Sequence, residues 1–177
     1  MKTSLLYGFI SALGGAFLTL ILFFLGFHSD PAKLGTAGWV GGLIGTAVAV
    51  VCVVLGVKAR KAEAPPDQPF GYGKAFGAGM MVSVVSSVLG ALFAFLYWAV
   101  INPGISDIVV QSQVAKFEAN GLTGDKLDNA EAMVRKMASP LPQAITALIF
   151  GLLFGLVISL IVAAILKKPE PESPPTL

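Results

Sequence analysis

Residues 71–103 read GYGKAFGAGMMVSVVSSVLGALFAFLYWAVINP, and this stretch decides the fold. Its glycine-rich beginning carries Lys74, residues 75–101 are uncharged, and Tyr97 and Trp98 stand near its far end. A bilayer core about 30 Å thick requires about 20 apolar residues of helix, and aromatic residues gather at membrane interfaces. The stretch therefore predicts a transmembrane helix over 75–101, ended by Asn102-Pro103 because the residue before a proline avoids helical angles.

Three further apolar runs cover residues 5–27, 37–57 and 141–166. The chain is 55% hydrophobic and only 12% charged, whereas soluble domains have roughly a quarter of their residues charged. We expect the first run to be retained, because the apolar region of a signal peptide has only about 7–15 residues. The sequence predicts an all-α membrane bundle of four transmembrane helices forming one domain over 1–168. The proline-rich tail, 169–177, is expected to be disordered.

The longest polar segment, residues 103–139, holds four basic and five acidic residues. It predicts two amphipathic helices that form a hairpin, the first beginning with Ser106 as its N-cap and ending at Ala119, the second beginning near Thr123. Asn120-Gly121 makes the break. The hairpin either lies on the membrane surface or caps the bundle. Its expected apolar stripes are Ile108, Val109 and Phe117 in the first helix, and Leu127, Ala130, Met133, Val134 and Met137 in the second.

Basic residues indicate the orientation of the four spans. Cytoplasmic loops carry an excess of Lys and Arg near the ends of the spans. If the chain crosses the membrane four times, most of its basic residues lie on one side of the membrane. We therefore expect both termini and the tail to be cytoplasmic and segment 103–139 to be extracytoplasmic. The residues on the basic side are Lys2, Lys58, Arg60, Lys61, Lys74, Lys167 and Lys168.

The ten residues Phe70–Gly79, FGYGKAFGAG, resemble the opening of the third span in a family of small bacterial four-span membrane proteins, domain-of-unknown-function family 4199. Trp98 near the end of that span, Pro140 at the start of the last span and Leu166-Lys167-Lys168 at its end fit the same pattern. The resemblance implies a location in the bacterial inner membrane and no established activity. This chain departs from the family in its additional glycines and its less charged external segment.

None of the four predicted spans contains Asp, Glu, Lys, Arg or His. Because charged residues inside membranes usually mark ion paths, proton relays or catalysis, the sequence argues against a coupled transporter, an intramembrane protease and a proton channel. It predicts no enzyme, no catalytic residue, no metal and no cofactor. His28 with Asp30 provides too few ligands for a metal site, and Cys52 is expected to be a small packing residue.

Small and basic residues supply the remaining candidate sites. Glycines at a spacing of four let helix backbones approach closely, within one chain or between chains. The basic residues near the cytoplasmic ends either bind lipid headgroups or only set the topology by reaching the interface. The candidates for helix packing are Gly38, Gly41, Gly42, Gly45, Gly73, Gly77, Gly151 and Gly155, and those for lipid headgroups are Lys58, Arg60, Lys61 and Lys74.

Three functions fit these features. The first is a non-enzymatic accessory or scaffold subunit that packs its glycine-rich faces against another membrane protein or itself, with the external hairpin as the recognition surface. The second is a homo-oligomeric channel or small-solute transporter. The third is a lipid-binding membrane protein. No cluster of basic and aromatic residues indicates nucleic acid. The residues that could line a pore are Thr46, Ser83, Ser86, Ser87, Thr146 and Ser159.

Overall fold

The computed structural model describes residues 2–65 and 68–167. In these residues it contains four long helices, a π-helical turn and a pair of shorter helices. Four helical segments are long and apolar enough to cross a membrane, which confirms the predicted all-α fold with four candidate spans. The helical elements are α1 (Lys2–Phe24), α2 (Leu34–Ala62), α3 (Tyr72–Leu96), η1 (Tyr97–Ile101), α4 (Ile105–Ala119), α5 (Asp125–Met137) and α6 (Pro140–Leu166).

The helix ends differ from the predicted spans for two reasons. Helix α1 stops at Phe24, before the predicted end at residue 27, because the chain turns at Gly26, whose φ of 78° favours glycine. Helix α2 continues to Ala62, past the predicted end at residue 57. Hydropathy marks where a membrane segment ends, whereas Lys58, Arg60 and Lys61 remain good helix formers.

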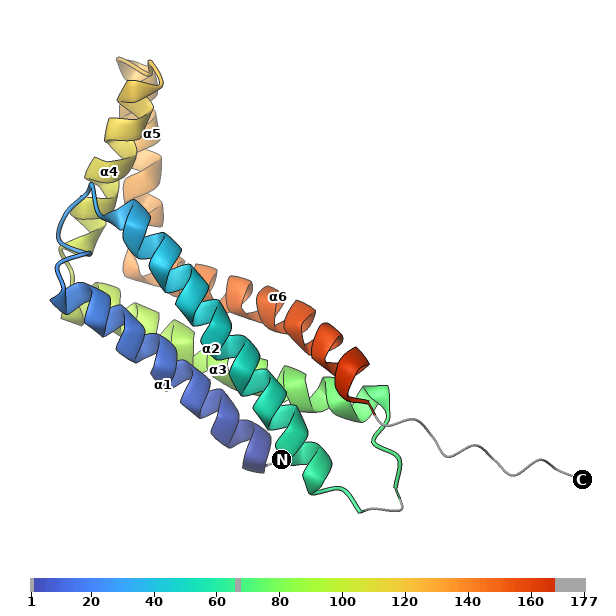
Figure 1. Ribbon diagram of the computed structural model, residues 1–177. Helices are drawn as coiled ribbons and strands as arrows, with labels where there is room; N and C mark the ends of the chain where they lie inside the picture. Colours follow the sequence, from blue (N-terminus) through green and yellow to red (C-terminus); the bar gives the residue numbers. More distant parts are fainter. Residues whose placement is uncertain (1, 66–67, 168–177) are drawn as a thin grey trace, which may run out of the picture.

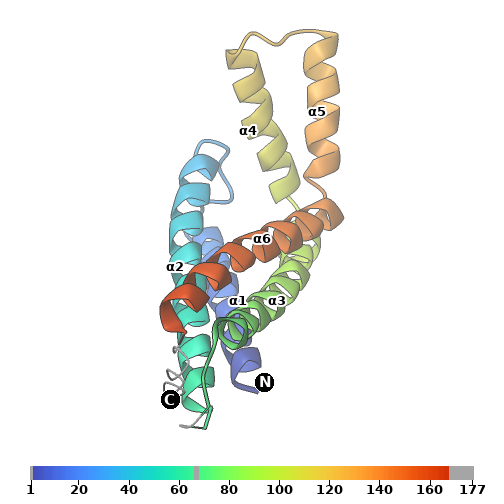
Figure 2. The same ribbon diagram turned by 90° about the vertical axis from the view of Figure 1, so that its right-hand side faces the viewer.

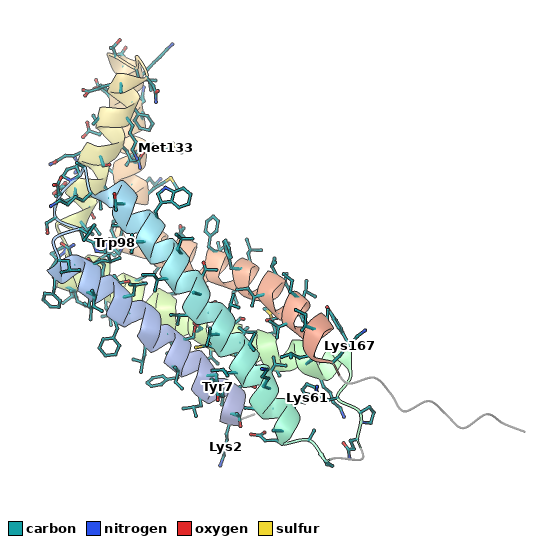
Figure 3. All side chains as sticks on the ribbon, in the orientation of Figure 1. Lys2, Tyr7, Lys61, Trp98, Met133 and Lys167 are labelled. Carbon is teal, nitrogen blue, oxygen red and sulfur yellow. The ribbon has the colours of Figure 1, made fainter. Side chains whose placement is uncertain are left out.

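Helix α3 is the centre of the bundle. It packs most extensively against α6 and also contacts α1 and α2. In Figures 1 and 2 these helices lie together as a bundle, and the α4–α5 hairpin rises from one end of it. Lys2, Lys61 and Lys167 lie at the opposite end (Figure 3). We call these the hairpin end and the basic end.

The hydrophobic core lies toward the basic end, where residues from α2, α3 and α6 meet. Four of the five buried residues of α2 lie in its second half, and only Ala37 is buried near the hairpin end. In the view of Figure 2, α6 crosses near α2 at the basic end and diverges from it toward the hairpin end. The bundle is therefore closed at one end and open at the other. The core residues are Cys52, Val53, Val57, Phe70, Ala75, Ala78, Val82, Val162 and Ala163.

The outer surface of the four long helices is apolar. Phe24 is 79% exposed and Ile165 is 72% exposed, and many other large apolar side chains of the bundle are also exposed. Soluble proteins rarely expose apolar patches of this extent. The surface is therefore the kind that lipid tails would cover, which agrees with a multi-pass membrane protein.

The segment predicted as a hairpin contains two helices, α4 and α5, that pack against each other and stand away from the bundle in both ribbon views (Figures 1 and 2). Arg135 joins them through an ion pair with Asp107 at 2.8 Å. The N-cap prediction for Ser106 is wrong, because Gly104 holds that position. The Ser106 hydroxyl instead donates a hydrogen bond to the carbonyl of Ala138 at 2.6 Å, which ties the first turn of α4 to the end of α5.

The apolar stripe expected on α5 divides into two parts. Leu127, Ala130 and Val134 are half-buried, while Met133 is 66% exposed and Met137 is 53% exposed. Since α5 contacts only α4 and the start of α6 extensively, one edge of the stripe has no cover among the described residues. The expected tail, 169–177, lies outside the residues that the structure describes.

Candidate functional site

The tightest helix contact is an antiparallel seam between α3 and α6. Along it a small residue of one helix faces a small residue of the other at every fourth position: Gly79 faces Ser159, Ser83 faces Gly155, and Ser87 faces Gly151. A Cβ at Gly151 would lie 2.6 Å from Ser87 Oγ, and one at Gly79 would lie 3.0 Å from Ser159 Oγ. A Cβ at Gly151 or Gly155 would force the facing serine or its helix to shift, whereas at Gly79 the neighbouring atoms would have to give by a few tenths of an ångström.

Two of the three serine hydroxyls of the seam, those of Ser83 and Ser159, find partners within it. Ser83 donates to the carbonyl of Gly79 at 3.2 Å, and its Oγ lies 3.4 Å from Ser159 Oγ. Ser159 is fully buried. At the neighbouring helix contact, Ser86 donates to Ser11 at 3.0 Å. These serines therefore act as contacts between helices.

The predicted glycine pairs occupy two kinds of position. Gly151 and Gly155 lie in the α3–α6 seam. A Cβ added at Gly41 would make an ordinary contact with Leu22, at 3.4 Å from Leu22 Cδ1. At the remaining predicted positions, a Cβ would meet no described atom within 4 Å. These positions are Gly38, Gly42, Gly45, Gly73 and Gly77. Four close glycine contacts were missed: Gly8 against Val85 and Gly56 against Val82, both at 2.7 Å, and Gly14 against Val48 and Gly79 against Ser159, both at 3.0 Å.

The sequence held a signal for two of the four missed contacts, since Gly79 and Ser83, like Ser4 and Gly8, are small residues four positions apart. Ser4 and Gly8 are both buried and stand four residues apart on α1. Counting serine among the small residues would have found this pair. Gly56 has apolar Cys52 and the charged Arg60 at the corresponding positions on α2, so no spacing rule singles it out.

An open groove follows the hairpin-end half of α2. Its volume is about 430 Å³, and among the described residues only those of this helix line it, including Gly35, Gly38, Gly42 and Thr46. Trp39 stands beside the groove and is 75% exposed. A spacing of four between Gly38, Gly42 and Thr46 repeats the spacing seen in the α3–α6 seam, but here no described residue fills the groove.

A polar cluster lies at the hairpin end, where η1 places Tyr97 against the loop after α1. Tyr97 is only 2% exposed. Its hydroxyl lies 2.6 Å from His28 Nδ1 and accepts a hydrogen bond from Asn102 Nδ2 at 3.2 Å. Burial lowers the pKa of His28. Phe23 packs edge-on against the Tyr97 ring.

Sequence reasoning paired His28 with Asp30, and the structure does not bring these two together. Asp30 instead accepts a hydrogen bond from the backbone N–H of Ala32 at 2.9 Å and pairs with Lys33 at 3.7 Å. Tyr97 and Asn102 were missed as partners of His28. Nothing in the sequence marks the π-helical turn, whose wider winding sets the position of Tyr97 relative to Asn102.

The basic residues at the basic end have protein partners of their own. Arg60 pairs with Glu63 at 2.7 Å, and Lys61 donates to the carbonyl of Leu166 at 2.9 Å. Lys74 donates to the carbonyl of Pro69 at 3.3 Å, and Lys58 is exposed. Hydrogen bonds from Thr3 and then Arg60 hold the pKa of Glu63 below its usual value.

Two of the four predicted lipid contacts meet in one place. Arg60 and Lys74 line a cavity of about 390 Å³ together with Glu63. The carboxylate of Glu63 offsets part of the positive charge there, which weakens the attraction for an anionic headgroup. Lys58 and Lys61 do not line this cavity.

Comparisons with known proteins place the chain by family. The profile of DUF4199, described as a protein of unknown function, matches residues 6–168. This match confirms the resemblance carried by Phe70–Gly79, Trp98 and the last span. Searches of curated proteins and of solved structures find no match. The chain belongs to the DUF4199 family of proteins of unknown function.

Proposed function

We propose that this chain is a non-enzymatic accessory or scaffold subunit of a membrane complex. In the proposal, the hairpin-end half of α2 docks against a transmembrane helix of a neighbouring subunit, in the simplest case α2 of a second copy. The α4–α5 hairpin, with Met133 and Met137 exposed, is the recognition surface outside the membrane. Flexible methionine side chains suit such surfaces because they adapt to the shape of a partner.

The observation that carries the proposal is the contrast between two glycine-rich helix faces. At Gly79, Gly151 and Gly155 of the α3–α6 seam, the space beside each glycine is filled by a serine of the facing helix. At Gly38 and Gly42 on α2 the corresponding space is empty. Helices in lipid associate through close backbone approach at small residues. The face with Gly38, Gly42 and Thr46 therefore has the form of one half of a helix–helix contact.

A second copy is a suitable occupant because a groove of small residues is self-complementary. When two such helices cross at their glycines, each backbone enters the other's groove, and the same residues contribute from both sides. Trp39 and Leu43, which flank the groove, would then cover the sides of the contact.

A pore is less well supported. It requires a continuous polar lining, yet Ser83 and Ser86 hydrogen-bond within the bundle and Ser159 is fully buried. Hydroxyl groups that already hydrogen-bond within the protein have little capacity left to bind water or an ion along a pore.

The proposal includes a location in the bacterial inner membrane with both termini in the cytoplasm. Lys2, Lys61 and Lys167 lie together at the basic end (Figure 3). The positive-inside tendency assigns such an end to the cytoplasm, which leaves the hairpin on the other side.

The test is the oligomeric state of the full chain in lipid nanodiscs after extraction from native membranes, measured by native mass spectrometry. We expect a defined complex from the wild type and its loss in Gly42→Ile, because the added side chain fills the groove. Since a Cβ at Gly42 meets nothing within the chain, this variant should still fold. Ala47→Ile, which adds bulk to another exposed face of α2, should leave the complex intact. A wild type that is strictly monomeric, or equal effects of both substitutions, contradicts the proposal.

A further inference from the structure

A crevice enters the bundle from the hairpin end. It consists of a cavity of about 530 Å³ and a deeper one of about 460 Å³, which share residues and so join. The deeper cavity in turn shares Ser11, Ser86 and Gly90 with a third cavity of about 330 Å³ between α3 and α6. Small-molecule sites have volumes of about 300–1,000 Å³ and mostly apolar walls. The residues common to the first two cavities are Gly15, Thr19, His28, Gly45, Trp98 and Ile105.

The deep walls of the crevice are suited to an apolar ligand. Many of their side chains are small or apolar, and the hydroxyls among them are already bonded within the protein. Thr19 donates to the carbonyl of Gly15 at 3.0 Å, and Ser86 donates to Ser11 at 3.0 Å. Hydrocarbon can lie beside such groups without leaving a polar atom unsatisfied.

The mouth of the crevice is polar and carries a positive charge. Ser112, Gln113 and Lys116 line it from α4. No Asp or Glu lines either cavity, and Lys116 takes part in no ion pair of residues 2–65 and 68–167. The mouth therefore favours an anionic group.

His28 adds a hydrogen-bond donor at the same place. The amide nitrogen Asn102 Nδ2 can only donate, so the Tyr97 hydroxyl accepts that bond, and its own proton is free for donation to the neutral His28 tautomer in which Nδ1 is the acceptor. A neutral His28 then carries its proton on Nε2. Because His28 lines both cavities, its side chain adds this donor to the crevice.

We propose that this crevice binds an anionic phospholipid, with an acyl chain along the deep walls and the phosphate group at the mouth beside Lys116, Gln113 and His28. The apolar deep walls suit the acyl chain of such a lipid. The hydrogen-bond donors and the cation at the mouth suit its phosphate group. The crevice opens toward the bilayer beside the exposed glycines Gly38 and Gly42, so a lipid can enter from the leaflet at the hairpin end. This site is separate from the basic residues at the other end of the bundle.

The test uses the two tryptophans as reporters. In Trp39→Phe, the fluorescence of the full chain comes only from Trp98, which lines the crevice. The protein is placed, one copy per nanodisc, in phosphatidylcholine that contains a variable fraction of lipid brominated on its acyl chain, a quencher at contact distance. We expect brominated phosphatidylglycerol to quench Trp98 at a mole fraction about fivefold lower than brominated phosphatidylcholine requires. This factor is the gain in affinity expected from one lysine near an anionic headgroup. The control Trp98→Phe reports on Trp39, which is exposed, and should show no headgroup preference.

Two further variants, made in the Trp39→Phe background, separate the parts of the site. Lys116→Gln should remove the headgroup preference while Trp98 stays accessible to both brominated lipids. Gly15→Leu should abolish quenching of Trp98 by filling the crevice, and it should fold because a Cβ at Gly15 meets nothing within 4 Å. Equal quenching by the two lipids, no quenching by either, or quenching that persists in Gly15→Leu would overturn the proposal. With a single copy per disc, these outcomes do not depend on whether α2 self-associates.

Discussion

At the scale of the residue, His28 shows how strongly one side chain depends on its surroundings. In sequence it stands beside Asp30 and resembles a solvated loop residue. In the structure it is half-buried and bonded to Tyr97, with Lys116 of α4 lining the same cavity. Burial disfavours a charged imidazole and so lowers the pKa of His28.

We predict that His28 makes stability depend on pH. Its pKa in the folded protein lies below the unfolded value of about 6.5, so the unfolded chain binds the additional proton. The stability from neutral His28 is full above about pH 6.5 and decreases as the pH falls toward the lowered folded pKa, below which the loss levels off. Thermal unfolding in mild detergent should show a lower midpoint at about pH 5.5 than at about pH 7.5.

His28→Gln provides the control, because His28 is the only histidine of the chain. The variant should lose most of the decrease between the two pH values while keeping the contribution of other groups. A decrease of the same size in wild type and variant would show that His28 is not its source.

At the scale of the element, the α3–α6 seam stabilises the bundle because its small residues let the two helix backbones approach closely. Ser83 and Ser87 of α3 fit against Gly155 and Gly151 of α6. In lipid, where apolar burial provides no driving force between helices, this close fit contributes dispersion contacts over the length of the seam.

We predict that Gly155→Ala destabilises the protein by about 1–3 kcal/mol, the usual cost of overpacking a tight contact. The new methyl group would overlap Ser83. Gly77→Ala is the matched control: Gly77 lies in a membrane helix but a Cβ there meets nothing within 4 Å, so alanine should be neutral or slightly stabilising. Unfolding midpoints in detergent measure both changes, and equal midpoints for the two variants would contradict the account of the seam.

The elements could be predicted well because each depends on local sequence. Long uncharged runs gave the four spans, and the charged segment after Pro103 gave the helical hairpin. The glycine contacts could be predicted only in part. Spacing identifies Gly151 and Gly42 equally, but which glycine has a partner depends on how the helices cross. The His28–Tyr97–Asn102 cluster could not be predicted, because it depends on a π-helical turn that no pattern in residues 97–101 indicates.

At the scale of the whole molecule, the bundle is closed by a core at the basic end and open at the hairpin end. The run of glycines in α2 explains this difference, since residues without side chains cannot fill the space between diverging helices. The open half provides both surfaces that our proposals use, the groove of α2 and the crevice, and the two share Gly38 and Gly42.

We predict that the hairpin is extracytoplasmic and the basic end cytoplasmic. In a Cys52→Ala background, which removes the only native cysteine, Glu118→Cys should react in intact spheroplasts with a maleimide that cannot cross membranes. Ala62→Cys, at the other end, should react only after the membrane is permeabilised. Both positions are exposed, so a difference in labelling reports the side of the membrane, and the reverse pattern would invert the topology.

The central claim is that the small-residue groove of α2 docks against α2 of a second copy. Disulfide formation in native membranes tests it most directly. The test compares two variants in the Cys52→Ala background: Thr46→Cys, at a position that lines the groove, and Ala47→Cys, at the next position, which does not line it. These positions have nearly the same depth but point in different directions around the helix. We predict a cross-linked product of fixed mass, twice that of the chain, from Thr46→Cys alone. No product from Thr46→Cys, or equal products from both variants, would contradict the claim.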